Sequence, residues 1–161
     1  MLDDRQVGMV REVFDRLNRN ARRLTNQELR HAQFEGWLIT TTEAEAEREE
    51  WKELGVTTRA RSTRMMDSQF ISELILVILE SRVIGFDQNV LDQLYGKYDD
   101  LTELTDFSLD DFSIKYEFVK ATILAMERHN GSITKWAKGF GAFYGLWALV
   151  ALHYNHSLTL S

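Results

Sequence analysis

Arginine side chains are concentrated in one short stretch of this chain, residues 13–32. Four of them stand directly before a predicted helix start: Arg16, Arg19, Arg22 and Arg23. The planar guanidinium group suits phosphates and carboxylates, and the free N–H groups of a helix N-terminus favour an anion at the same place. Several cations beside the positive end of a helix dipole have an energetic cost, which a bound anion would remove. The chemistry that this stretch suggests is anion binding.

The helix behind these arginines has a well-defined predicted start at Thr25. Its hydroxyl can accept a hydrogen bond from a free N–H group of the first turn, and Glu28 can reach back to the Thr25 amide. Leu24 and Leu29 occupy the two positions of a hydrophobic staple. Because a cap of this kind contributes about 1 kcal/mol, we expect the second helix to begin directly after Thr25.

A simpler interpretation of the same arginines is that they form surface ion pairs. Eleven of the twelve Lys and Arg residues in residues 1–64 are arginine, so a composition bias would place several in any short stretch. On this interpretation Arg16 bridges Asp15 or Glu12 to the next helix, and Asn18 merely ends the first one. From the residues alone it is favoured over an anion site.

The composition indicates one domain. The chain has 161 residues, a net charge of −6, and neither proline nor cysteine. The absence of proline favours uninterrupted helices, and the absence of cysteine excludes disulfides and thiolate sites and fits a reducing cytoplasm. Residues 1–64 contain 12 cations and 12 anions, whereas residues 65–161 contain 7 and 13. Any nucleic-acid contact would therefore use the first third of a single cytoplasmic domain spanning residues 1–161.

Hydrophobic periodicity predicts an all-α fold of about five to seven helices and no clear strand. The first covers Asp4 to about Asn18, and the second weakens at threonines 40–42, where we expect a break. Further boundaries are expected at Asp87, Ser108 and Asn130–Gly131. Apolar helices at about 69–83, 109–129 and 133–154 are expected to form the centre. The first of them is interrupted at helical spacing by Glu73, Glu80 and Arg82.

Two charged segments are assigned to the surface. Residues 43–54 are rich in glutamate and are expected to form a solvated helix face. Residues 56–66 are expected to be a basic connector, and the spacing of its arginines favours neither a helical nor a strand face. The last helix is apolar all round for only 14 residues, 139–152. A membrane span needs about 20 residues, so we expect a buried core helix and no membrane segment.

Neither a catalytic constellation nor a metal site is evident. His153 and His156 are three residues apart, but a metal needs at least one further ligand, and no carboxylate lies nearby in the sequence. The glycines at 139, 141 and 145 do not have the spacing of a dinucleotide-binding fingerprint. We therefore expect no catalytic residue, no metal and no cofactor bound by this chain alone.

The arginine stretch resembles a motif of a known prokaryotic family. The chain contains F-x-R-L-N at residues 14–18 and L-T-x-Q-E-L-R-H-A at residues 24–32, a pattern similar to the signature of the GmrS-type family. Its members are large proteins with a ParB- or sulfiredoxin-like N-terminal nucleotide-binding domain and a helical region behind it. They occur in type IV restriction and other phage-defence systems, often coupled to an HNH nuclease. The match to the family motif is specific over residues 13–32 and moderate over residues 59–80. The rest of the sequence is compatible with the family without matching a motif.

The resemblance implies that this chain is the helical portion of a longer protein and contributes to a nucleotide site. The family's Asp-Gly-Gln-Gln-Arg turn and the nuclease motif are not in this sequence. Arg16 and Asn18 would contact phosphates, together with Arg19, Arg22 and Arg23. Four residues would support them: Thr25, Gln27, Glu28 and Arg30.

The same resemblance implies partners for this chain. A nucleotide domain upstream would complete the site and use an NTP with Mg²⁺, and an HNH nuclease domain would act with it. We do not expect this chain to hydrolyse a nucleotide by itself. Two alternatives stay open: a non-catalytic protein-interaction or homo-oligomerisation module, and DNA contact through Arg59, Arg61 and Arg64.

Overall fold

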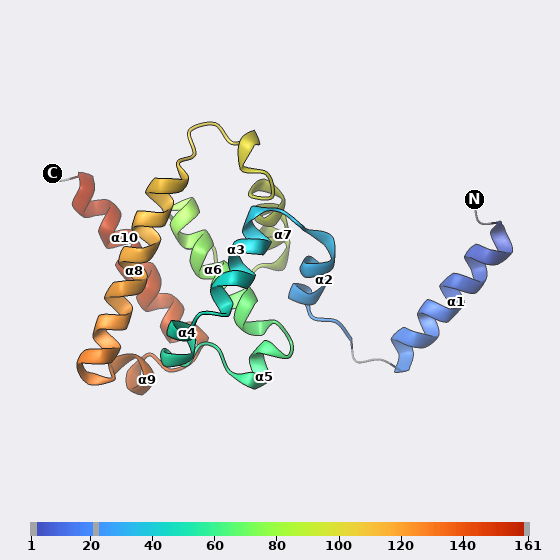
Figure 1. Cartoon of the computed structure of the whole chain (residues 1–161), viewed down its shortest axis with the longest axis horizontal. Helices are drawn as coiled ribbons and strands as arrows, with labels where there is room; N and C mark the ends of the chain where they lie inside the picture. The colour runs from blue at the N-terminus through green and yellow to red at the C-terminus, as the bar shows by residue number, and fades with distance from the viewer. Residues whose placement is uncertain (1–2, 21–22, 160–161) are drawn as a thin grey trace.

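The computed structural model describes residues 3–20 and 23–159, with side chains for residues 3–17 and 23–156. These residues form helices and no strand, which confirms the all-α prediction with more helices than the five to seven expected. The helices are α1 (Asp4–Asn20), α2 (Asn26–Gln33), α3 (Trp37–Ala46), α4 (Glu49–Glu53), α5 (Arg59–Ser62), α6 (Met66–Glu80), α7 (Gln88–Lys97), the 3-10 helix η1 (Leu101–Glu103), α8 (Leu109–Asn130), α9 (Ser132–Trp136) and α10 (Phe140–Thr159) (Figure 1).

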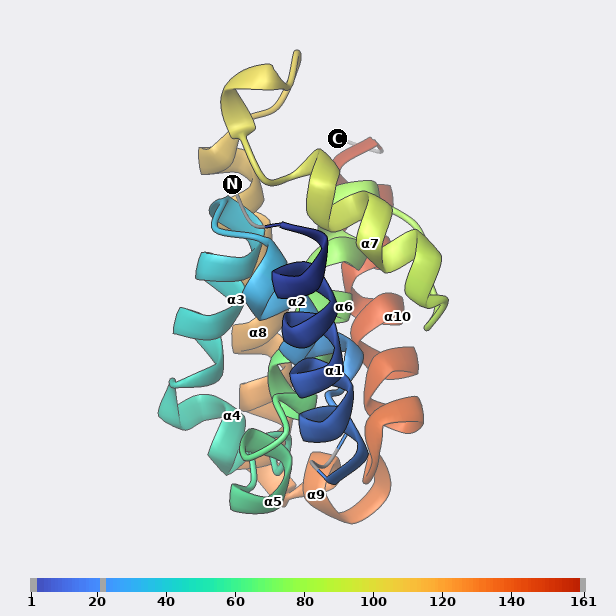
Figure 2. The same cartoon turned by 90° about the vertical axis from the view of Figure 1, so that its right-hand side faces the viewer.

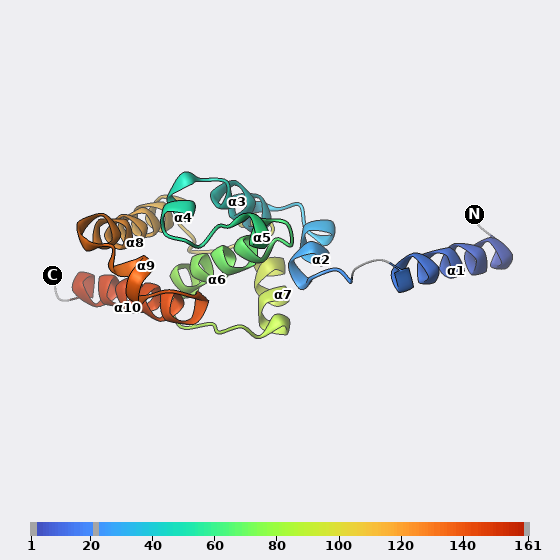
Figure 3. The ribbon, with the colours of Figure 1, turned by 90° about the horizontal axis from the view of Figure 1, so that it is seen from below.

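Helix α6 is the centre of the fold and contacts α2, α3, α5, α8 and α10. Figure 3 shows α8 and α10 toward one end of this body and α2 toward the other. Every residue of α6 from Phe70 to Ile78 is buried, as an apolar run on all faces of a helix requires. The buried Trp147 of α10 adds a polar contact, since its Nε1–H donates to the Leu74 carbonyl at 2.9 Å.

Helix α1 lies apart from this body (Figures 1 and 3). In Figure 2 it stands in front of the other helices, toward the viewer. All of its described side chains are exposed. The predicted apolar stripe of Val7, Val10, Phe14 and Leu17 is present, but these side chains are 48% to 64% exposed. The stripe therefore has no neighbour in the described part of the chain.

The break expected at threonines 40–42 lies earlier, at residues 34–36, so that prediction is wrong. Helix α3 runs through all three threonines. The boundary is set by Gly36, whose N–H donates to Asp99 Oδ1 at 2.8 Å. A Cβ at this glycine would lie only 2.1 Å from the Asp99 carbonyl oxygen. A tertiary contact, rather than the β-branched side chains, determines where the helix is interrupted.

The single helix expected over residues 133–154 is divided into α9 and α10. Gly139, between them, has φ of +94°, a conformation that side chains other than hydrogen disfavour. The prediction that this segment is buried on all faces is wrong for one face, because Leu149 is 67% exposed. Within the described residues, none of the helices combines the length and apolarity required to cross a bilayer.

Each of the two charged segments has a structural feature that the sequence did not predict. The basic connector contains the short helix α5, where the Thr58 hydroxyl accepts from the Arg61 N–H at 3.3 Å. In the glutamate-rich segment, Glu45 is buried and its Oε1 accepts from Lys120 Nζ at 2.6 Å and from Trp51 Nε1 at 3.0 Å. A segment expected to be solvated thus supplies a buried ion pair to the core.

Candidate functional site

The start of α2 is built as the sequence predicts. Thr25 Oγ1 accepts from the Glu28 N–H at 3.2 Å, and Glu28 Oε2 accepts from the Thr25 N–H at 2.5 Å, which confirms the capping box. The Thr25 hydroxyl also donates to the Arg64 carbonyl at 3.1 Å. This bond ties the first turn of α2 to the residues that precede α6.

The Arg64 side chain lies at the same contact between the start of α2 and the residues before α6. Its Nη2 donates to the Arg23 carbonyl at 2.5 Å and lies 3.3 Å from Glu28 Oε2. The side chain is only 14% exposed, and its Nε is buried without a hydrogen-bond partner among the described residues. This member of the proposed DNA-contacting set is therefore directed at the start of α2.

Gln27 and Arg30, predicted to support a site, form a buried polar cluster between α2, α6 and α7. Arg30 Nε donates to Asp92 at 2.7 Å and its Nη2 to Gln88 Oε1 at 2.8 Å. Its remaining N–H groups go to other oxygens nearby, so all five donors of the guanidinium have partners. Gln27 Nε2 donates to the Tyr95 hydroxyl at 2.9 Å. Arg30 therefore joins helices and has no donor left for a ligand.

Glu73 is a second charged group inside this part of the fold. It is 2% exposed, and Gln69 Nε2 donates to its Oε1 at 3.1 Å. Burial raises the pKa of Glu73 to about 7, against the opposing effects of the Gln69 hydrogen bond and the Arg30 charge. Such a group is frequent at functional sites. The sequence signal for it is a single acid within the apolar run 70–79, which the periodicity argument used only as a helix marker.

A pocket of about 620 Å³ opens beside Glu73, between α2, α6 and the start of α10. Its volume falls within the range typical of small-molecule sites. The sequence did not reveal this pocket, because its walls come from segments far apart in the chain. Its main polar lining groups are Thr25, Gln27, Arg64, Gln69, Glu73 and Gln88.

Of the predicted phosphate-contacting residues, the two with described side chains, Arg16 and Arg23, do not line this pocket. Arg16 lies on α1, and its Nη2 donates to Glu12 Oε1 at 2.9 Å. The simpler interpretation includes this ion pair, which joins two residues of α1 rather than α1 to the next helix. Arg23 is exposed. Three of the predicted side chains lie outside the described ones: Asn18, Arg19 and Arg22. The structure thus does not bring the described arginines of the stretch together.

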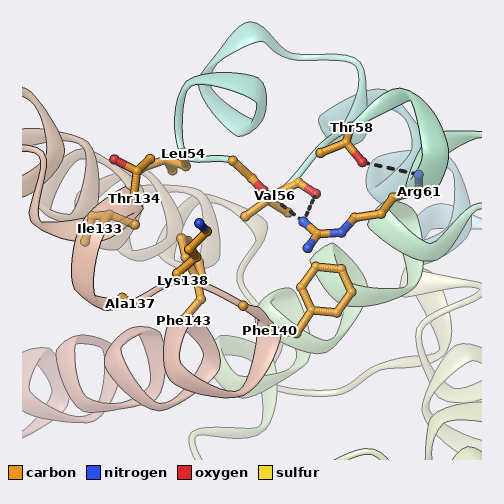
Figure 4. A pocket seen from close by; sticks show the side chains of 12 residues that line it. Leu54, Val56, Thr58, Arg61, Ile133, Thr134, Ala137, Lys138, Phe140 and Phe143 are labelled. Carbon is orange, nitrogen blue, oxygen red and sulfur yellow. Dashed lines mark hydrogen bonds between the residues drawn. The ribbon is translucent and has the colours of Figure 1, made fainter.

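Arg61 is held against the body, as Figure 4 shows. Its Nη1 donates to the carbonyls of Gly55 and Val56, both at 2.8 Å. The guanidinium lies over the Phe140 ring, 4.3 Å from its centroid, beside a pocket of about 270 Å³ with mostly apolar walls. Arg59 is exposed. The arginines proposed to contact DNA therefore do not form one continuous basic surface.

Other signs of a site are few. In the described ranges, no three His, Cys, Asp or Glu side chains are grouped so that they could hold a metal ion. Comparison of the chain with protein-family models, with curated proteins and with solved structures gives no match. The function is therefore inferred from the residues themselves and from where the fold places them.

Proposed function

We propose that this chain is the helical portion of a GmrS-like NTP-dependent restriction or defence protein. In this proposal α1 presents Arg16 and Asn18 to the phosphates of a nucleotide that an adjoining domain holds. The observation that supports it best is the uncovered apolar face of α1, because the F-x-R-L-N motif lies at the end of that same helix.

An amphipathic helix gains most of its stability by packing its apolar face against something. Helix α1 has 17 residues, and Met9 and Val13 widen its exposed apolar stripe. Covering the exposed half of such a side chain contributes about 1 kcal/mol. Arg16 follows Val13 by three residues, so it flanks this face. A domain that covers the face would therefore lie next to the Arg16 guanidinium.

The ion pair that Arg16 makes in the structure does not oppose this role. Arg16 and Glu12 are one helical turn apart, and their side chains are largely exposed. Exposed pairs at this spacing contribute about 0.3–0.5 kcal/mol. A phosphate can form two parallel charge-assisted hydrogen bonds with a guanidinium, so exchange of Glu12 for a phosphate group is favourable.

In this proposal, the residues predicted to support the nucleotide site hold the backbone in place and do not contact the nucleotide. The Thr25–Glu28 capping box and the bond from Thr25 to Arg64 anchor the beginning of α2 on the body. They therefore fix one end of the turn that joins α1 to α2.

The test is binding of fluorescent ATP and GTP analogues, with Mg²⁺, to the protein produced from the whole reading frame that contains these residues. We expect Arg16→Ala to weaken binding by about ten- to a hundredfold, since a charged hydrogen bond contributes about 1.5–3 kcal/mol. Arg11→Ala is the matched control, because Arg11 is an exposed arginine of the same helix that lies outside the F-x-R-L-N motif. Equal effects of the two substitutions, or wild-type protein that binds no nucleotide, would contradict the proposal.

A protein-interaction or oligomerisation module is the second candidate. It is favoured by apolar side chains exposed on the outer faces of α8 and α10, among them Ile114, Phe118 and Leu149. Contiguous exposed apolar surface often marks interaction sites. Light scattering should then show a concentration-dependent mass that Leu149→Asp abolishes. A monomer at every concentration would exclude the oligomeric form of this candidate.

A further inference from the structure

The pocket beside Glu73 combines an apolar wall with one acid. Met66, Phe70 and Phe86 supply apolar side chains, and Glu73 is the one acid among polar lining groups that also include Gln69 and Arg64. Phe70 and Glu73 are three residues apart on α6, so they project from neighbouring turns of the same helix face. A ligand that reaches the carboxyl group would therefore also meet aromatic surface.

The charged side chains around the pocket differ in whether they form ion pairs. Arg30 bonds to Asp92 at 2.7 Å, and Arg64 lies 3.3 Å from Glu28. Glu73 makes no ion pair among the described residues, where the Gln69 carboxamide is its hydrogen-bond donor. A carboxylate can accept several more hydrogen bonds, and a buried charge without a partner is costly. The nearby cations Arg30 and Arg64 thus have other acids as ion-pair partners, and Glu73 has only a neutral carboxamide as its hydrogen-bond donor among the described residues.

We propose that this pocket binds a small organic cation, an amine or amidinium attached to an aromatic or aliphatic group. The positive group lies on the Glu73 carboxylate and the apolar group lies against Phe70 and Phe86. A charge-assisted hydrogen bond and aromatic contact with a cation are both favourable in a partly desolvated pocket. This site is on the helical body and is separate from the nucleotide site proposed for α1.

The groups that face Glu73 determine how binding depends on pH. Arg30 from α2 and Arg64 ahead of α6 are the cations on this side, and the Arg30 charge opposes the rise in the pKa of Glu73. On α7, Asp92 is bonded to Arg30, and burial raises the pKa of Tyr95, which keeps it neutral. Glu73, with its pKa of about 7, is the group that titrates. A cation requires the carboxylate, so below pH 7 binding must expel a proton, and affinity should rise about tenfold from pH 6 to pH 8.

Isothermal titration calorimetry or NMR titration of the whole chain with benzamidine tests this proposal, and the neutral isostere benzamide is the comparison ligand. We expect wild-type protein to bind benzamidine at least about tenfold more tightly than benzamide at pH 8. No benzamidine binding up to about 10 mM, or equal binding of the two ligands, would overturn the proposal.

Three variants separate the contribution of the Glu73 carboxylate from that of apolar packing. Glu73→Gln keeps the side-chain shape and should weaken benzamidine binding at least about tenfold and remove its pH dependence. Glu103→Gln is the matched control, because Glu103 is an exposed acid on η1, and it should change neither. Phe86→Ala, a substitution at a half-exposed position, should weaken binding without abolishing the pH dependence. Retained affinity in folded Glu73→Gln would overturn the proposal, whatever the nucleotide experiment shows.

Discussion

Helices α1 and α6 show opposite relations between a hydrophobic pattern and the folded structure. Helix α1 has the cleaner amphipathic pattern, with apolar residues at spacings of 3, 4 and 3, yet none of its described side chains is buried. Helix α6 has an almost uninterrupted apolar run, and every residue from Phe70 to Ile78 is buried. An all-apolar helix must lie at the centre of its own fold. An amphipathic stripe shows that a helix needs a partner, but it does not identify the partner.

This difference predicts unequal consequences for similar substitutions in the two regions. Several charged side chains of the body, such as Arg30, have partners from distant segments, whereas Arg16 of α1 has its partner Glu12 one turn away. Matched substitutions can therefore test whether α1 is independent of the body in this chain.

The largest contrast is expected between two arginines. Arg30→Ala removes a buried guanidinium from Asp92 and Gln88 and leaves their region without its central donor. We expect a loss of about 3 kcal/mol in the free energy of unfolding, measured by urea denaturation. Arg16→Ala on α1 should cost less than about 0.5 kcal/mol. Similar losses for both would mean that α1 contributes to the stability of the body after all.

A smaller effect is expected from the acid buried in α6. The pKa of Glu73 is raised from 4.5 to about 7, so between these values the folded chain holds a proton that the unfolded chain releases. Ionisation of Glu73 should therefore lower the free energy of unfolding of the wild-type protein by about 2–3 kcal/mol as pH rises from about 4.5 to above 7.

Glu73→Gln should remove that decrease, because glutamine does not titrate. Urea denaturation of both proteins at pH 5 and pH 8 measures the difference, which should favour the variant more strongly at pH 8. Parallel profiles for the two proteins would show that Glu73 titrates normally and is not desolvated as the fold implies.

The smallest effect concerns the start of α2, where the chain enters the body after α1. Thr25→Ala removes the capping hydroxyl and its bond to the Arg64 carbonyl, which should cost about 1 kcal/mol. For a chain of this size that corresponds to a shift of about 2–4 °C in Tm. Thr25→Ser retains the hydroxyl and should restore most of the loss. Equal destabilisation by both substitutions would assign the effect to packing of the methyl group instead.

Several helix boundaries could be predicted because they depend on neighbours within four positions. Thr25, Asp87 and Ser108 each accept a backbone N–H at a helix start, as expected. Gly131 ends α8 with φ of +66°. The break at Gly36 could not be predicted, because it depends on Asp99, 63 residues later.

The candidate site could be predicted only in part for the same reason. Gln27 and Arg30 were selected by a motif, and their partners Tyr95 and Asp92 lie 68 and 62 residues away in the chain. In the sequence, Glu73 cannot be distinguished from a surface glutamate. Its burial in the folded chain is what raises its pKa. Periodicity therefore identified the helix that carries Glu73 but not the pocket beside it.

The amino-acid order was sufficient to specify a helical chain and several of its caps, because helix formation and capping involve residues one turn apart. Packing alone determined that Arg30, Glu45, Glu73 and Lys120 lie inside and that the stripe on α1 lies outside. Burial is a property of segments that meet in space, and no local pattern encodes which segments meet.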